Sequence, residues 1–172
     1  MKTDVIKIRW EGPLPITQVL KKDNGGSKPH YNGNDYGLYQ VYGKHILYGK
    51  GKEREALLYI GQATKQTFAR RFKQHENDWI QYEPAGEGIK VYLGRLNSKK
   101  YTPRDKWKTW HRDVNIAEAI LIYKYTPCYN SNLKWEFPDV LFNFKSMQLE
   151  HSGPKKHLRK FDNAPKDYKK EG

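Results

Sequence analysis

Residues 56–80 read ALLYIGQATKQTFARRFKQHENDWI and change their hydrophobic period along the way, which decides the fold. The first five residues are almost all apolar, which predicts a short strand that is buried and central in a sheet. From residue 67 to about residue 80, apolar residues recur at helical spacing, which predicts an amphipathic helix. A buried strand that leads into such a helix indicates a mixed α/β domain.

Further strands are predicted before and after this unit, from period-two alternation and from Tyr- and Val-rich composition. They cover residues 4–10, 36–42, 45–48 and 89–96. A turn is expected at residues 43–44, and the two prolines within residues 12–15 are expected to end the first strand. Residues 16–20 fit either a helical turn or an extended piece.

A second helix is predicted over residues 115–125, because Pro127 ends the pattern there. The order of elements predicts an α/β (α+β) fold with a small, mostly antiparallel β-sheet flanked by helices. We expect one domain over residues 1–150, including an N-terminal extension. The polar, basic residues 151–172 are expected to form a mobile tail.

The charge of the chain points to a polyanionic partner. Among 172 residues, Lys and Arg number 32 and Asp and Glu number 19, so the net charge is +13. No basic amphipathic helix is evident, and no apolar run approaches the roughly 20 residues of a membrane span. Nucleic acid is therefore the expected partner, and a membrane is not.

Cysteine content and the N-terminus indicate the compartment. Cys128 is the only cysteine, which excludes an intramolecular disulfide framework and a Cys-rich zinc site. The N-terminal residues MKTDVIKIRW lack the apolar core of a secretory signal. We therefore expect a reducing, cytoplasmic environment.

One face of the helix over residues 67–80 combines apolar and ionisable side chains. Phe68, Arg71, Phe72 and His75 follow the i, i+3, i+4, i+7 spacing and share this face, whereas Arg70 turns away. A cation on a packed face needs an anion, and a phosphate group would serve. The alternative is that Arg71 extends past Phe72 to water.

Glu118 is the acidic residue of the apolar helix predicted over residues 115–125. One interpretation is structural, because Asn115 at the N-cap and Glu118 three residues later would form a capping box. Sequence spacing alone does not decide between this cap and a functional carboxylate.

An ordered set of short motifs resembles the GIY-YIG nuclease superfamily. The set consists of two tripeptides, a helical Arg, a helical Glu and a late Asn: Gly37-Leu38-Tyr39, Tyr59-Ile60-Gly61, Arg71, Glu118 and Asn130. Leu38 replaces the usual Ile of the first tripeptide. The long connection between the tripeptides, and the spacing from Glu118 to Asn130, look most like the type II restriction endonuclease branch.

The resemblance implies a divalent-metal-dependent DNA endonuclease of site-specific restriction type. It implies that the hydroxyls of Tyr39 and Tyr59 reach the active site, that Arg71 stabilises charge in the transition state, and that Glu118 binds one Mg²⁺. Mn²⁺ is an expected substitute. The general base stays open between Tyr39 and His75, because a phenol with a pKa near 10 is a poor base at neutral pH.

Plainer interpretations accompany two of these assignments. Tyr39 and Tyr59 could be ordinary packing residues of strands. Asn130 is expected to support the site or contact a phosphate, or else to be a turn residue after Pro127.

A basic segment comes after the last predicted strand. Residues 97–112 read NSKKYTPRDKWKTWHR, a loop by composition whose cations would grip phosphates and whose aromatic rings would stack or else pack inward. The expected DNA contacts are Lys99, Lys100, Arg104, Lys106, Trp107 and Lys108, together with Arg70. Double-stranded DNA is the expected substrate, bound by a homodimer if the site is palindromic. Alternatives are a catalytically inactive nucleic-acid-binding module or a homing, repair or toxin nuclease.

Overall fold

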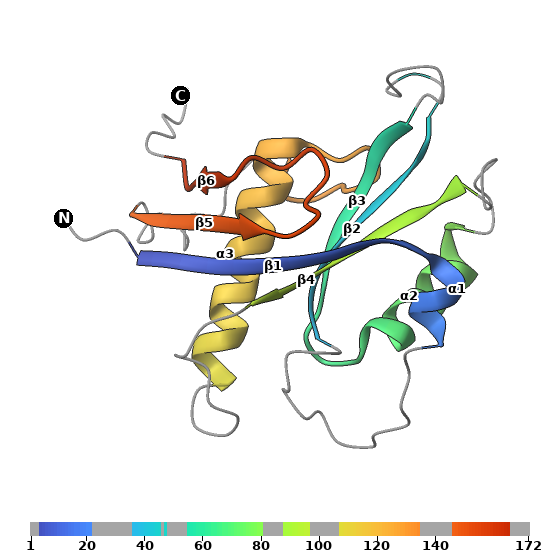
Figure 1. Ribbon diagram of the computed structural model, residues 1–172, viewed down its shortest axis with the longest axis horizontal. Helices are drawn as coiled ribbons and strands as arrows, with labels where there is room; N and C mark the ends of the chain where they lie inside the picture. Colours follow the sequence, from blue (N-terminus) through green and yellow to red (C-terminus); the bar gives the residue numbers. More distant parts are fainter. Residues whose placement is uncertain are drawn as a thin grey trace.

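In the part of the chain that the structure describes, one six-stranded sheet forms the centre of the fold, and three helices pack against it (Figure 1). The computed structural model describes residues 4–21, 36–45, 47, 55–80, 88–96, 107–134 and 146–165. Within these ranges the elements are β1 Asp4–Pro15, α1 Ile16–Leu20, β2 Gly37–Lys44, β3 Glu55–Ala63, α2 Phe68–Asp78, β4 Lys90–Leu96, α3 Trp107–Tyr125, β5 Met147–Ser152 and β6 Phe161–Asn163.

The strand order is β3-β2-β4-β1-β5-β6. Every neighbouring pair is antiparallel except β1 and β5, which run parallel. The predicted fold class is therefore confirmed: the protein is an α+β domain with a mostly antiparallel sheet flanked by helices. In the part of the chain that the structure describes, no helix has the length and apolarity needed to cross a membrane.

The sheet separates two apolar cores, and the alternation of β2 shows how. Leu38 and Tyr42 belong to a core shared with α3, whereas Tyr39 and Val41 belong to a core shared with α1 and α2. All four side chains are fully buried. Successive strand residues point to opposite faces, so this single strand carries residues for both cores. Burial of each large apolar side chain stabilises the fold by roughly 1.5–3 kcal/mol.

Strand β1 is longer than predicted, since residues 12–15 do not end it. The pairing of β1 with β4 shifts register between Glu11 and Leu14 and then continues to Pro15. A bulge of this kind accommodates Gly12 and Pro13 without ending the strand. Residues 16–20, which fitted a helical turn or an extended piece, form the short helix α1.

The predicted turn at residues 43–44 is wrong. Strand β2 continues to Lys44, which pairs with Glu55 of β3. Of the predicted return strand over residues 45–48, only His45 and Leu47 are described, and neither lies in a strand.

The prediction that residues 56–60 form a central strand is also wrong, because β3 lies at the edge of the sheet. Its alternate residues nevertheless reach both cores: Ile60 contributes to the core with α3, and Tyr59 packs against the other. The chain after α3 also covers its outer edge, where the backbone N–H groups of Cys128 and Tyr129 donate to Leu57 and Leu58. An apolar run therefore indicated burial correctly, but not position.

Helix α3 begins at Trp107, about two turns before the predicted start. The stretch from residue 107 to residue 125 holds neither Gly nor Pro, so nothing interrupts the helix. Asn115 lies inside it and cannot be its N-cap, so the capping-box interpretation of Glu118 is wrong. Residues 107–112 are helical rather than loop, and Trp110 packs inward, 5% exposed.

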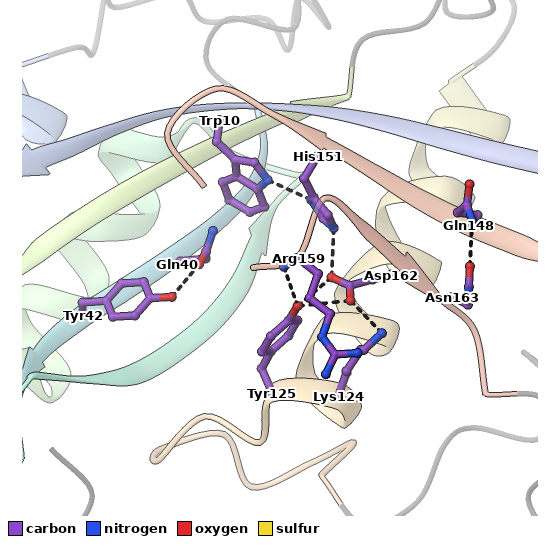
Figure 2. A network of polar contacts seen from close by, with 10 residues as sticks. All are labelled: Trp10, Gln40, Tyr42, Lys124, Tyr125, Gln148, His151, Arg159, Asp162 and Asn163. Atoms are coloured by element: carbon purple, nitrogen blue, oxygen red, sulfur yellow. Dashed lines mark hydrogen bonds and ion pairs between the residues drawn. The ribbon is translucent and has the colours of Figure 1, made fainter. Parts of the chain in front are cut away.

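Residues 151–165 do not form the expected tail. They complete β5 and form β6, while residues 166–172 lie outside the described part. Figure 2 shows the polar network that holds this segment against α3 and β1. At its centre the fully buried Asp162 accepts hydrogen bonds from the hydroxyl of Tyr125, at 2.9 Å for the closer oxygen.

Two further cationic or protonated partners meet Asp162. The Nζ of Lys124 lies 2.7 Å from one carboxylate oxygen, and the Nε2 of His151 lies 3.2 Å from the other. Burial alone would raise the pKa of Asp162, but the hydrogen bonds from His151, Lys124 and Tyr125 lower it below the ordinary value. A buried carboxylate requires such partners, and they explain why a polar segment is part of the fold.

Candidate active site

The site begins where Tyr39 of β2 lies directly opposite Gly61 of β3. A Cβ atom at position 61 would collide with the hydroxyl of Tyr39, so glycine leaves the space that the phenol occupies. The ring of Tyr59 stacks on that of Tyr39, with centroids 6.1 Å apart and planes 16° apart. The two tripeptide motifs therefore meet in space through their tyrosines.

Helix α2 places two more predicted residues over Tyr39. Phe68 and Phe72 are buried in the core with β2 and fix the rotation of the helix. The Nε2 of His75 consequently lies 2.6 Å from the Tyr39 oxygen, and the Nε–H of Arg71 donates to that oxygen at 3.3 Å. The predicted helix phase is confirmed, because Arg71 lies over Tyr39 whereas Arg70 is exposed.

Arg71 also bridges toward the surface. Its Nη1 donates to the Oε1 of Gln74 at 3.0 Å, and Gln74 exchanges hydrogen bonds with Gln66. The guanidinium is half-buried, whereas Tyr39 beneath it is 0% exposed and Tyr59 is only partly buried. Arg71 and Tyr59 are thus the groups that a ligand from solvent meets first.

The charges of the site shift the pKa values of these groups. Burial, followed by the neighbouring Tyr59, raises the pKa of Tyr39 well above its ordinary value, although Arg71 opposes the shift. Burial also raises the pKa of Tyr59, again against Arg71. Burial and then Arg71 lower the pKa of His75 to about 4. At neutral pH both phenols are therefore protonated and the imidazole is neutral.

Glu118 of α3 completes the set from the other side of the β3 edge. Its Oε2 accepts a hydrogen bond from the Nε2 of Gln62 at 2.6 Å. Burial raises the pKa of Glu118 to about 7, while Gln62 and Arg71 oppose the shift. The charge of Glu118 in turn raises the pKa values of Tyr39 and Tyr59. The carboxylate is therefore close enough to act electrostatically on the tyrosines and on Arg71.

The donors around Glu118 fit a hard divalent cation. The Oε1 of Gln62 is buried and has no hydrogen-bond partner in the structure. An unpartnered amide oxygen beside a carboxylate suits Mg²⁺, which takes oxygen ligands and often only one or two carboxylates. Among the described residues, no three His, Cys, Asp or Glu side chains are grouped to hold a metal, so a cation here would depend on a single carboxylate.

Asn130 serves the site through the backbone of β3. Its Oδ1 accepts from the N–H of Ile60 at 3.0 Å, and its Nδ2 donates to the carbonyl of Ile60 at 2.8 Å. Asn130 is 8% exposed, and both ends of its side-chain amide are engaged with Ile60. Asn130 therefore positions the strand between Tyr59 and Gly61, which favours a role in supporting the site over a phosphate contact or a simple turn residue.

Two residues of the site were missed by sequence reasoning. Gln62 directly follows the second tripeptide, and Trp79 lies four residues after His75, one helical turn away. The Nε1 of Trp79 lies 3.0 Å from the Nδ1 of His75. The helical spacing of Trp79 could have revealed it, whereas Gln62 has no comparable sequence signal.

The predicted DNA contacts are only partly covered by the structure. Lys99, Lys100, Arg104 and Lys106 lie outside the described residues, as does the side chain of Trp107. Lys108 and Arg70 are both exposed. Burial and then the charge of Lys65 lower the pKa of His111, so the loop before α2 and the first turns of α3 lie near each other.

The chain matches no family model, no curated protein and no solved structure. The interpretation of the site therefore rests on its own residues. Those residues come from β2, β3, α2 and α3, and they meet around the oxygen of Tyr39 and the carboxylate of Glu118.

Proposed function

We propose that this protein is a divalent-metal-dependent DNA endonuclease of the GIY-YIG type that hydrolyses phosphodiester bonds at specific sites. The observation that carries the proposal is the convergence of Tyr39, Tyr59, Arg71 and Glu118 from four separate elements. These groups suit phosphodiester hydrolysis: one guanidinium, two phenols and one carboxylate near the protein surface. The net charge of +13 supports a polyanionic substrate.

Each residue has a role in this reaction. A water oxygen forms the new bond to phosphorus and the bond to the leaving oxygen breaks. The proton of the water is taken either by Tyr39, which must first lose its own proton and act as a phenolate, or by the neutral imidazole of His75. Arg71 holds the phosphate and stabilises the charge that develops on it. The half-buried Tyr59 orients the water. Glu118 would hold Mg²⁺, or Mn²⁺ in its place, and Gln62 would support that carboxylate.

When bound, the cation supplies positive charge that stabilises the leaving oxygen and the phosphate. The substrate of the proposal is double-stranded DNA, and a palindromic site would be read by a homodimer. Arg70 and Lys108 are exposed and are the described candidates for phosphate contacts.

Replacement of Glu118 tests the proposal directly. With Mg²⁺ and plasmid DNA, the wild-type protein is expected to give discrete fragments, and Glu118→Ala is expected to bind DNA without cutting it. Glu76→Ala is a matched control, because Glu76 pairs with Lys73 at the surface of α2. Full cleavage by Glu118→Ala at saturating Mg²⁺ would contradict the metal assignment.

A nucleic-acid-binding module without catalysis is the second candidate. One observation favours it: the hydroxyl of Tyr39 is covered by Arg71, and Tyr39 is 0% exposed. The same assay separates the candidates. A mobility shift without cleavage indicates a binding module, and a smear of products indicates a nonspecific nuclease such as a repair or toxin enzyme.

A further inference from the structure

Trp79 begins a short chain of hydrogen bonds that ends at Tyr39. The indole Nε1 lies 3.0 Å from the Nδ1 of His75, and the Nε2 of His75 lies 2.6 Å from the Tyr39 oxygen. An indole N–H can only donate a hydrogen bond. The Nδ1 of His75 must therefore accept, and it carries no proton.

This donor assignment fixes the tautomer of His75. A neutral imidazole has one proton, so with Nδ1 occupied as an acceptor the proton lies on Nε2 and points at Tyr39. Burial and then Arg71 lower the pKa of His75, and Asp78 opposes them, so the ring is neutral near pH 7. The Nε2 of His75 thus already carries a proton and cannot accept another.

We propose that Trp79 is a positioning residue that holds His75 as a donor to Tyr39, so that His75 cannot take a proton from the tyrosine. The inference rests on the proposed nuclease function and refines it, because it excludes a proton relay from Tyr39 to His75. The Tyr39 oxygen then receives two N–H groups, from His75 and from Arg71. Arg71 opposes, without overcoming, the burial that raises the pKa of Tyr39, so the phenol keeps its proton. Two N–H groups aimed at its oxygen turn its own O–H away from them.

The same protein contains a second contact of this kind. The Nε1 of Trp10 donates to the Nδ1 of His151 at 3.0 Å, and the Nε2 of His151 lies 3.2 Å from a carboxylate oxygen of Asp162 (Figure 2). Because its Nδ1 accepts from the indole of Trp10, the proton of the His151 ring lies on Nε2 there too. In both pairs the indole N–H donates to Nδ1, and the proton of the imidazole is therefore on Nε2.

Nitrogen-15 NMR of the full chain labelled at histidine tests the proposal without DNA or metal. His75 in the wild-type protein is expected to be protonated on Nε2. Trp79→Phe keeps an aromatic ring but removes the N–H, and is expected to give a mixture of both tautomers. Benzothienylalanine at position 79 keeps the indole shape without a donor and is expected to give the same mixture, which covers the case in which the phenylalanine variant folds poorly. Trp10→Phe is the matched control and should leave His75 unchanged.

Single-turnover cleavage completes the test. In the Trp79 variants, where His75 is no longer held in one tautomer, the cleavage rate is expected to fall about 10-fold and its pH profile is expected to change. Loss of a group that orients an imidazole has effects of this size. A wild-type His75 protonated on Nδ1, or a tautomer that is unchanged in both Trp79 variants, would overturn the inference. If no DNA is cleaved but the tautomer changes as expected, the nuclease proposal fails and the assignment of Trp79 and His75 stands.

Discussion

The pairs Trp79–His75 and Trp10–His151 share the same hydrogen bond from an indole to an imidazole Nδ1, and they differ in the group that the imidazole contacts on its other side. In each pair, an indole N–H lies 3.0 Å from the Nδ1 of an imidazole. The Nε2 of the first imidazole meets the neutral phenol of Tyr39, and the Nε2 of the second meets the charged carboxylate of Asp162.

The charges around Tyr39 and around Asp162 differ, and this difference indicates different roles for the two pairs. Asp162 is enclosed by Lys124, His151 and Tyr125, and its pKa lies below the ordinary value. Around Tyr39 the pKa values run the other way: burial raises those of Tyr39 and Glu118. Ionisable groups whose burial is not fully offset by partner charges or hydrogen bonds are typical of reactive sites. Groups whose burial is offset in this way are typical of structural sites. The same tryptophan–histidine contact thus supports stability in one place and, under the proposed function, chemistry in the other.

Loss of Arg71 should have the largest effect. This effect should be limited to the site around Tyr39 and the Trp79–His75 pair. Arg71→Ala is expected to slow the chemical step by about 10²- to 10³-fold, because it removes a charge aimed at the phosphate. Arg70→Ala, one position earlier and exposed, should mainly weaken binding. The measurement is single-turnover cleavage at saturating enzyme and Mg²⁺. The reverse result would mean that the assignment of α2 residues to the site is wrong.

Asp162→Asn should damage the other pair instead. The amide leaves Lys124 and His151 without their buried anion, so the free energy of unfolding is expected to fall by about 3 kcal/mol. Denaturant unfolding measures this loss. The cleavage rate of the folded fraction should stay within a few-fold of wild type, and a loss comparable to that of Arg71→Ala would merge the two regions into one functional unit.

The pH dependence of stability should carry the signature of His75. Its pKa is about 4 in the folded protein, against about 6.5 in the unfolded chain. Between these values the unfolded chain binds more protons at His75, so the contribution of His75 to the free energy of unfolding falls as the pH falls, by roughly 3 kcal/mol in total. Glu118, whose pKa is raised to about 7, contributes a slope of opposite sign. His75→Gln should flatten this slope between pH 6.5 and pH 4, as measured by denaturant unfolding. An unchanged slope would mean that His75 is protonated well above pH 4.

The smallest effects should distinguish the surfaces next to each pair. Loss of a phosphate contact lowers the slope of log K against log salt by about 0.9. Arg70→Ala with Lys108→Ala is expected to lower the slope by up to about twice that, whereas Arg159→Ala with Lys160→Ala, beside β6, should leave it unchanged. DNA binding titrated over a range of salt concentrations measures both. Equal slopes for the two double variants would place DNA on another face.

Sequence reasoning predicted the parts of the site that depend on local spacing. Phe68 and Phe72 set the phase of α2, so the spacing alone placed Arg71 and His75 on one face. It missed Gln62, which meets Glu118 only because β3 passes beside α3. The start of α3 was missed because its first turns are polar and basic, a composition that loops and exposed helices share.

The fold beyond residue 150 shows the same limit. Lys124, His151 and Asp162 are each residues typical of a protein surface, and Lys124 is far in sequence from the other two. Their burial is favourable only together, as a network of complementary charges. No short window of sequence contains that information, so the segment was predicted to be a tail.

The amide of Asn130 has a further consequence for the solution behaviour of the protein. Strand β3, which carries Tyr59, lies at the edge of the sheet. Unpaired peptide N–H and C=O groups on an edge strand can form hydrogen bonds with a strand of another molecule. Asn130 imitates a neighbouring peptide at Ile60, and the chain beside it pairs with Leu57 and Leu58. A strand that bears site residues can therefore lie within reach of a large substrate without becoming a seed for self-association.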